Sequence, residues 1–178
     1  SWLRLDNGKL KFRGGRQNIL FGSGYLFRPL GFFDTRNVTG VIPETNGVDG
    51  VRLTYSYENT SLVEGWIVPA KLNKRMITGL RWETMINEHE SGLVAQYHPE
   101  TDLGDLSQFE QELIQLGYYL KGEYHIGYWN EARLDLEHSK GGNPIRFDAV
   151  FGFDYTFDFG DGLHFLLEYF ISTREPQY

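Results

Sequence analysis

The stretch Ile145-Arg146-Phe147-Asp148-Ala149-Val150-Phe151-Gly152-Phe153-Asp154-Tyr155-Thr156-Phe157 decides the fold of this chain. Every odd position in it is apolar, and the positions between them are charged, small or polar apart from Val150. Successive side chains of a β-strand point to opposite faces, so the stretch predicts a strand with one apolar and one polar face. A helix would scatter the same residues around its circumference.

The same alternation recurs along the whole chain and predicts ten strands. We expect them near residues 2–6, 9–19, 50–58, 61–68, 74–86, 92–98, 109–121, 124–138, 144–158 and 162–173. The run 61–68 alternates least, because both of its faces carry apolar residues. Connections after odd strands are short, whereas those after even strands are longer, above all 20–49 and 99–108. Short turns at one end and longer loops at the other are typical of a transmembrane barrel.

Composition narrows the class of protein. The chain has 178 residues, few enough for a single domain spanning 1–178, with 16% aromatic residues and 21 glycines. The formal net charge of -7 argues against a nucleic-acid partner, which requires clustered Lys and Arg. The absence of cysteine excludes disulfides, thiol catalysis and zinc–thiolate sites. We expect no cofactor and no metal.

A membrane barrel and a soluble β-barrel or sandwich both remain open from alternation alone. Several runs are longer than the roughly 5–6 residues of a soluble strand and reach the roughly 9–11 that a tilted membrane strand needs. Aromatic residues gather near strand ends, as in an interfacial girdle. No run approaches the roughly 20 apolar residues of a membrane helix. We therefore expect an all-β, antiparallel, up-and-down transmembrane β-barrel.

Two segments resemble outer-membrane barrels of the Gram-negative alginate-export and porin-like type. The first, 15–29, has Gly-Arg-Gln at a strand end, then Phe-Gly-Ser-Gly-Tyr and Arg28-Pro29, with Phe32-Phe33 beyond. The second runs from Gly152 through Gly160-Asp161-Gly162 to Tyr169 and is similar to a late hairpin of such barrels. The resemblance implies a channel in the bacterial outer membrane. Such barrels are usually longer, and the tail 172–178 lacks an alternating terminal strand, so we expect a segment of a wider barrel, with an unusual ten-stranded barrel as the alternative.

The polar faces supply the candidate pore-lining residues. Basic residues dominate the early strands and acidic residues the late ones, which predicts a transverse field across the lumen. The alternative is that these charges only solvate a wet wall and pair with their neighbours. The pore-lining candidates are Arg13, Arg16, Arg52, Arg81, Glu83, Glu131, Arg133, Asp148, Asp154 and Glu168.

The long connection 20–49 is the candidate constriction. Folding inward would bury its aromatic residues and narrow a pore, whereas an extracellular loop packed on its neighbours, or a docking site for a partner, is the alternative. Gly14 and Gly15 allow a bulge that would turn Arg16 onto the wall of Arg52 and Arg81. Guanidinium groups at the narrowest point would favour anions.

Enzymatic signals are weak, since the five histidines are scattered without metal-ligand spacing and no nucleophile motif is present. We therefore expect a passive outer-membrane channel for small hydrophilic solutes, anions among them, and not an enzyme. A structural barrel that scaffolds a larger envelope complex is the alternative, and an outer-membrane enzyme is the third hypothesis. The expected partners are outer-membrane lipid, the solutes and envelope proteins.

Overall fold

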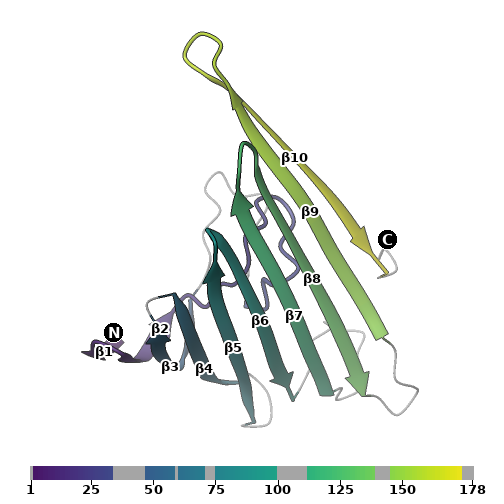
Figure 1. The fold of residues 1–178 in the computed structure, drawn as a ribbon. Coiled ribbons are helices and arrows are strands. Elements are labelled where there is room, and N and C mark those ends of the chain that lie inside the picture. The colour runs from purple at the N-terminus through teal and green to yellow at the C-terminus, as the bar shows by residue number, and fades with distance from the viewer. Residues whose placement is uncertain are drawn as a thin grey trace.

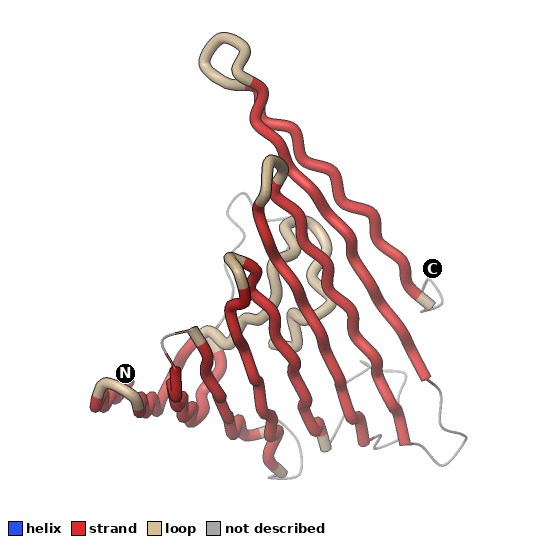
Figure 2. Tube along the Cα trace, viewed as in Figure 1, coloured by secondary structure: helices blue, strands red, loops and turns tan. Residues whose placement is uncertain are grey.

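Ten antiparallel strands follow one another in chain order and form one sheet (Figure 1). The computed structural model describes residues 2–33, 47–58, 60–70, 75–99, 112–138 and 145–173. The strands are β1 (Trp2–Asn7), β2 (Leu10–Gln17), β3 (Val48–Glu58), β4 (Ser61–Pro69), β5 (Met76–Ile86), β6 (His89–His98), β7 (Glu112–Glu123), β8 (Gly127–His138), β9 (Ile145–Phe157) and β10 (Leu163–Ser172). All the strands and loops drawn in Figure 2 belong to this single sheet and its connections.

The predicted all-β, up-and-down antiparallel topology is confirmed, with each of the ten strands near its expected place. β6 begins at His89, earlier than expected, because Asn87 and Glu88 take φ values of 48° and 69°. Two successive positive φ values are the geometry of a type I′ turn, which joins two strands with only two residues. The short turns after odd strands share one end of the sheet, and the longer connections leave from the other (Figure 1).

The sheet is open. β1 pairs with β2 and β10 pairs with β9, and within the described ranges these two strands are the edges of the ladder. The sheet twists strongly, so that β1 and β2 run in a clearly different direction from β9 and β10 (Figure 1). Such twist is the normal consequence of backbone chirality. Across the described part of the chain, no helix is long and apolar enough to cross a membrane.

The two faces of the sheet differ as the alternation predicted. Paired residues of adjacent strands share a face, so rows of side chains can be followed across the sheet. We call the apolar face the outer face and the other the inner face. One row of the outer face runs Phe12, Leu53, Gly65, Leu80, Ala95, Leu116, Leu134 and Phe147. Its neighbours on β9 include Phe151 and Phe153, which are 53% and 40% exposed. Ala149 lies on this face too but is buried. It is short, and its partner on β10 is the larger Ile171.

The opposite, inner face is built on aromatic rings that lie over glycines. Trp66 faces Gly79, Tyr119 faces Gly92 and Trp129 faces Gly152, each pair directly opposite on adjacent strands.

A Cβ added to any of these three glycines would come within about 2.2 Å of the facing ring. The glycines therefore provide the space in which the largest inner side chains lie flat on the sheet.

Gly79→Ala is expected to lower the free energy of unfolding by about 1–3 kcal/mol, because its methyl group would overlap the indole of Trp66. Gly65→Ala, on the paired strand, is the control, since a Cβ there meets nothing closer than 3.7 Å. Urea unfolding of both variants measures the difference. Equal midpoints for the two would show that the ring moves aside without cost.

Candidate functional site: the inner face and the segment that covers it

The chain leaves the ladder after Gln17, and residues 18–33, here called the inner segment, lie across the inner face (Figures 1 and 2). Of the expected alternatives for the connection 20–49, folding over the polar face of the sheet describes this part, and narrowing of a pore stays a prediction. Residues 34–46, including Pro43, lie outside the described ranges. The segment therefore covers part of the inner face of the sheet.

An apolar cluster joins the inner segment to β4–β7. The segment contributes Ile19, Phe21, Leu30 and Phe33, and the sheet contributes Trp66, Val68, Ile77, Val94 and Tyr119. The ring of Phe21 lies 4.7 Å from that of Trp66, and Leu30 is fully buried over Gly117. This packing explains why 61–68 alternates weakly, since the inner side chains of β4 face an apolar segment and not water.

Two carboxylates hold the turn of the segment through its backbone. Oε1 of Glu131 on β8 accepts the N–H groups of Ser23 and Gly24, the second at 2.5 Å. The carboxylate of Glu168 on β10 accepts the N–H groups of Tyr25, Leu26 and Phe27 at 2.6, 2.7 and 3.0 Å. Five neighbouring donors thus find charged acceptors, and such charge-assisted bonds are stronger than neutral ones.

Aromatic contacts accompany these hydrogen bonds. Tyr25 lies 4.9 Å from Trp129, whose Nε1 donates to Glu168 at 2.9 Å. Phe27 stacks on Phe170 of β10 with centroids 4.9 Å apart and an angle of 4°. The inner segment therefore bridges the sheet from β4 to its β10 edge.

Gly22 is required for the approach of the segment to Glu131. Its φ of +81° lies in the left-handed region, and a Cβ there would overlap the carboxylate, 2.2 Å from Oε1. Glycine adopts this conformation without steric cost. The Gly22-Ser23-Gly24 motif thus lets two backbone N–H groups reach a buried carboxylate.

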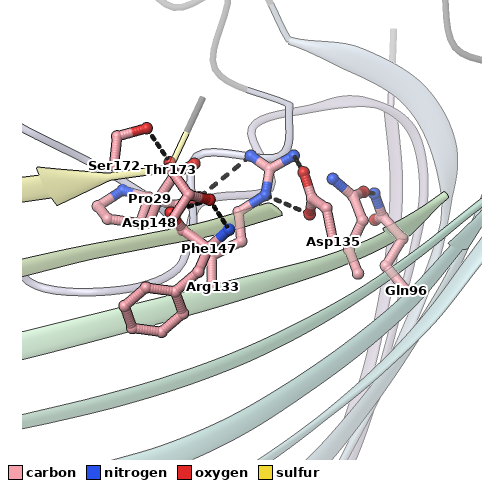
Figure 3. Close-up of polar contacts among 9 residues, drawn as sticks. Pro29, Gln96, Arg133, Asp135, Phe147, Asp148, Ser172 and Thr173 are labelled. Atoms are coloured by element: carbon pink, nitrogen blue, oxygen red, sulfur yellow. Dashed lines mark hydrogen bonds and ion pairs between the residues drawn. The ribbon is translucent and has the colours of Figure 1, made fainter. Parts of the chain in front are cut away.

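Arg133 fixes the return of the segment (Figure 3). Its guanidinium donates to the carbonyl of Pro29 at 3.2 Å and forms two hydrogen bonds of 2.7 Å to Asp135. It also lies 5.1 Å from the ring centroid of Phe32. A planar guanidinium can form two parallel bonds to a carboxylate while it also donates to a carbonyl and lies over a ring, and an ammonium group lacks this forked geometry.

Ion pairs neutralise much of the remaining inner face. Glu64 is 3.7 Å from both Arg52 and Arg81, and Arg81 is 3.2 Å from Glu83. Arg81 also lies 5.3 Å from the ring centroid of Phe21. These residues therefore pair with their neighbours, which is the alternative that the sequence offered to a transverse field.

Nine of the ten predicted pore-lining residues share the inner face: Arg13, Arg52, Arg81, Glu83, Glu131, Arg133, Asp148, Asp154 and Glu168. Glu131 and Asp148 are buried rather than open to a lumen, at 1% and 5% exposure. Ser172 donates to Asp148 at 2.6 Å, a contact at the β9–β10 edge drawn in Figure 3. These nine residues thus share one face of the sheet, as the alternation predicts, and several of these charges serve as internal partners, while a lining role in a pore stays a prediction.

Arg16 is the exception, and its predicted place is wrong. The ladder from Leu10 to Gln17 runs against Tyr55 to Val48 without a shift in register, so no bulge turns the chain at Gly14 and Gly15. Arg16 pairs with Asp49 and falls on the opposite face from Arg13. Gly15 does have a positive φ of 110°, but the pairing continues through it.

A row of buried amides was not predicted. Gln96 accepts a hydrogen bond from Nε1 of Trp66 at 2.9 Å and donates to Gln115 at 2.8 Å. Both glutamines lie in the inner row that continues to Asp135 on β8 and Arg146 on β9. The alternation alone places both glutamines on the inner face, but only the strand register shows that they lie in the same cross-strand row. Among the described residues no group of His, Asp and Glu is arranged to hold a metal ion.

Searches against protein-family models, curated proteins and solved structures find no match to this chain. The resemblance of 15–29 and 152–169 to alginate-export barrels therefore remains a prediction. The geometry of the two faces is the basis for a functional assignment.

Proposed function

We propose that the chain forms part of the wall of a bacterial outer-membrane β-barrel and serves as a porin-like channel for small hydrophilic solutes. The observation that carries the proposal is the difference between the two faces. The outer face exposes large apolar side chains on every strand except β8, whose outer apolar side chains are half-buried, whereas the charged residues gather on the inner face. Soluble proteins rarely expose apolar patches beyond a few hundred Å², so a lipid environment explains this face best.

Closure of the barrel is part of the proposal. β10 has ten residues without Lys or Pro, and β9 pairs with only one of its sides. A long apolar edge strand of this kind invites pairing with a further strand, because its free N–H and C=O groups need partners. We infer that further strands complete the wall between β10 and β1, as a wider barrel requires.

The inner segment is the proposed constriction, because it covers the inner face from β4 to β10. The pore would then run beside the segment. Lys11 and Arg13 lie on the inner face of β2, opposite Thr54 and Arg52, and Lys9 precedes them in the turn, where its carbonyl accepts the Ser56 N–H. Basic residues on this wall favour anionic solutes.

Planar-bilayer recordings test this proposal. Replacing Arg13 and Arg52 together with alanine removes two positive charges from the inner face, so the reversal potential in a salt gradient should shift toward cation preference. Arg16→Ala is the matched control, since Arg16 lies on the opposite face, and it should leave the reversal potential unchanged. Equal shifts for the two variants would contradict a lumen on the inner face.

A structural barrel is the second candidate, and the apolar cluster beneath the inner segment favours it. A filled interior conducts little. If the wild-type chain inserts into bilayers without measurable conductance, the scaffold function replaces the channel.

A further inference from the structure

A hollow of about 560 Å³ opens on the outer face, centred on Gly65 of β4. Its volume falls in the roughly 300–1,000 Å³ range of small-molecule sites. Its outer-face border is made almost entirely of apolar side chains from four neighbouring strands. They are Val51, Leu53, Tyr55, Val63, Ile67 and Leu80, with Phe12 of β2 beside Leu53.

The hollow exists because a side chain is missing from one row. Leu53 and Leu80 are the pairing partners of Gly65, so all three share the outer face. Val63 and Ile67 border the gap along β4 itself. The two leucines therefore form the side walls of a short groove, and the glycine forms its floor.

Nothing in the fold requires glycine at position 65. Its φ is not positive, and an added Cβ would meet Gly79 O at 3.7 Å and Leu80 Cδ1 at 3.9 Å, which are ordinary contacts. Gly79, Gly92 and Gly152 differ, because each has an aromatic ring in the space of its missing side chain. Gly65 instead leaves space that no part of the described chain fills.

The shape of the hollow selects its occupant. The gap is one residue wide between two leucines, so it fits a narrow occupant, whereas the interface of a stable protein partner spreads over roughly 800 Å² on each side. A hydrocarbon chain is narrow and apolar, and the rest of the outer face around the hollow is equally apolar. At the turn end of the same strands, Trp82 Nε1 donates to the Tyr57 hydroxyl at 2.8 Å, so two amphipathic rings lie where a lipid headgroup would begin.

We propose that the hollow at Gly65 binds one acyl chain of a membrane phospholipid. This inference rests on the proposed lipid contact of the outer face. The chain lies in the groove between Leu53 and Leu80, with its headgroup toward Tyr57 and Trp82.

The test uses the full chain reconstituted in vesicles of phosphatidylethanolamine and phosphatidylglycerol, then extracted in mild detergent for native mass spectrometry. The wild type should retain a phospholipid. Gly65→Leu fills the groove and should reduce the retained lipid at least tenfold, the change that about 1.4 kcal/mol produces. Ala95→Leu is the matched control, because it places the same leucine side chain in the same outer row but outside the hollow, and it should retain lipid as the wild type does.

The other outcomes overturn the inference. Equal retention by Gly65→Leu and the wild type would show that lipid binds elsewhere, and so would a wild type without retained lipid. A wild-type dimer that Gly65→Leu dissociates would identify a second copy as the occupant. If Gly65→Leu does not fold, Gly65→Ala applies the same test with a smaller expected loss. Flotation with the vesicles distinguishes failure of the membrane proposal from failure of the acyl-chain site. A wild type that does not float with the vesicles refutes both. A wild type that floats but retains no lipid refutes only the acyl-chain site.

Discussion

Glu131→Ala is expected to detach the inner segment from the sheet and to raise the rate at which chymotrypsin cuts after Phe21, Tyr25 and Phe27 by roughly 30- to 160-fold. The buried carboxylate accepts the N–H groups of Ser23 and Gly24, and its removal leaves both without an acceptor. Hydrogen bonds to a charged group are worth about 1.5–3 kcal/mol, and a loss of roughly 2–3 kcal/mol gives the stated change in the detached population. Cleavage follows that population when opening is fast relative to cutting.

Glu131→Gln provides a graded control. Both N–H groups bind the same oxygen, Oε1, which the glutamine amide can reproduce without the negative charge. The rate of cleavage should therefore lie between those of the wild type and Glu131→Ala. Glu123→Ala, an exposed carboxylate at the end of β7, should have no effect. Unchanged cleavage in Glu131→Ala would mean that the apolar cluster alone holds the segment.

The same substitution bears on conduction. If the inner segment narrows a pore, its release should raise single-channel conductance in Glu131→Ala relative to Glu131→Gln. If Glu131→Ala is cleaved faster than Glu131→Gln but the two conduct equally, the inner segment is released without any effect on a pore. It would then not be the constriction. The two measurements therefore test the hydrogen bonding and the proposed function independently.

Strand positions and faces could be predicted from the sequence because alternation is a local property. In β9, for example, every residue from Ile145 to Phe157 except Val150 fits the alternation of an apolar and a polar face. The paired register then follows from short turns such as Asn87-Glu88, which leave little freedom to slip.

The path of the inner segment could not be predicted in the same way. Ser23 meets Glu131 across 108 positions of sequence, and Tyr25 meets Glu168 across 143. Glu131 and Glu168 were placed on the correct face, but a charged residue on an inner face gives no sign of whether water or a backbone N–H will be its partner. The weak alternation of 61–68 was the one local signal that something apolar covers β4.

Arg16 shows the limit of reasoning from glycine. Gly14 and Gly15 permit a bulge, and Gly15 takes a positive φ, yet the ladder continues through both. Two glycines make a bulge possible but do not favour it, and the hydrogen bonds of the uninterrupted ladder stabilise regular pairing here. The basic wall therefore includes Lys11, Arg13, Arg52 and Arg81 but not Arg16.

Phe151→Arg is expected to reduce the free energy of unfolding from lipid bilayers by about 2–4 kcal/mol, the cost of a guanidinium at the middle of a lipid-facing strand. Phe151 is 53% exposed on the outer face, and in water an exposed arginine at this position would cost little. Phe151→Leu controls for the change in side-chain shape and should be nearly neutral. Thr156→Arg places the same charge on the other face of β9, where Thr156 is exposed and pairs with His164, and should also cost little. Urea titrations in phospholipid vesicles measure all three. A loss in Phe151→Arg no larger than that in Thr156→Arg would show that both faces of β9 meet water, and a soluble sheet would then replace the membrane wall.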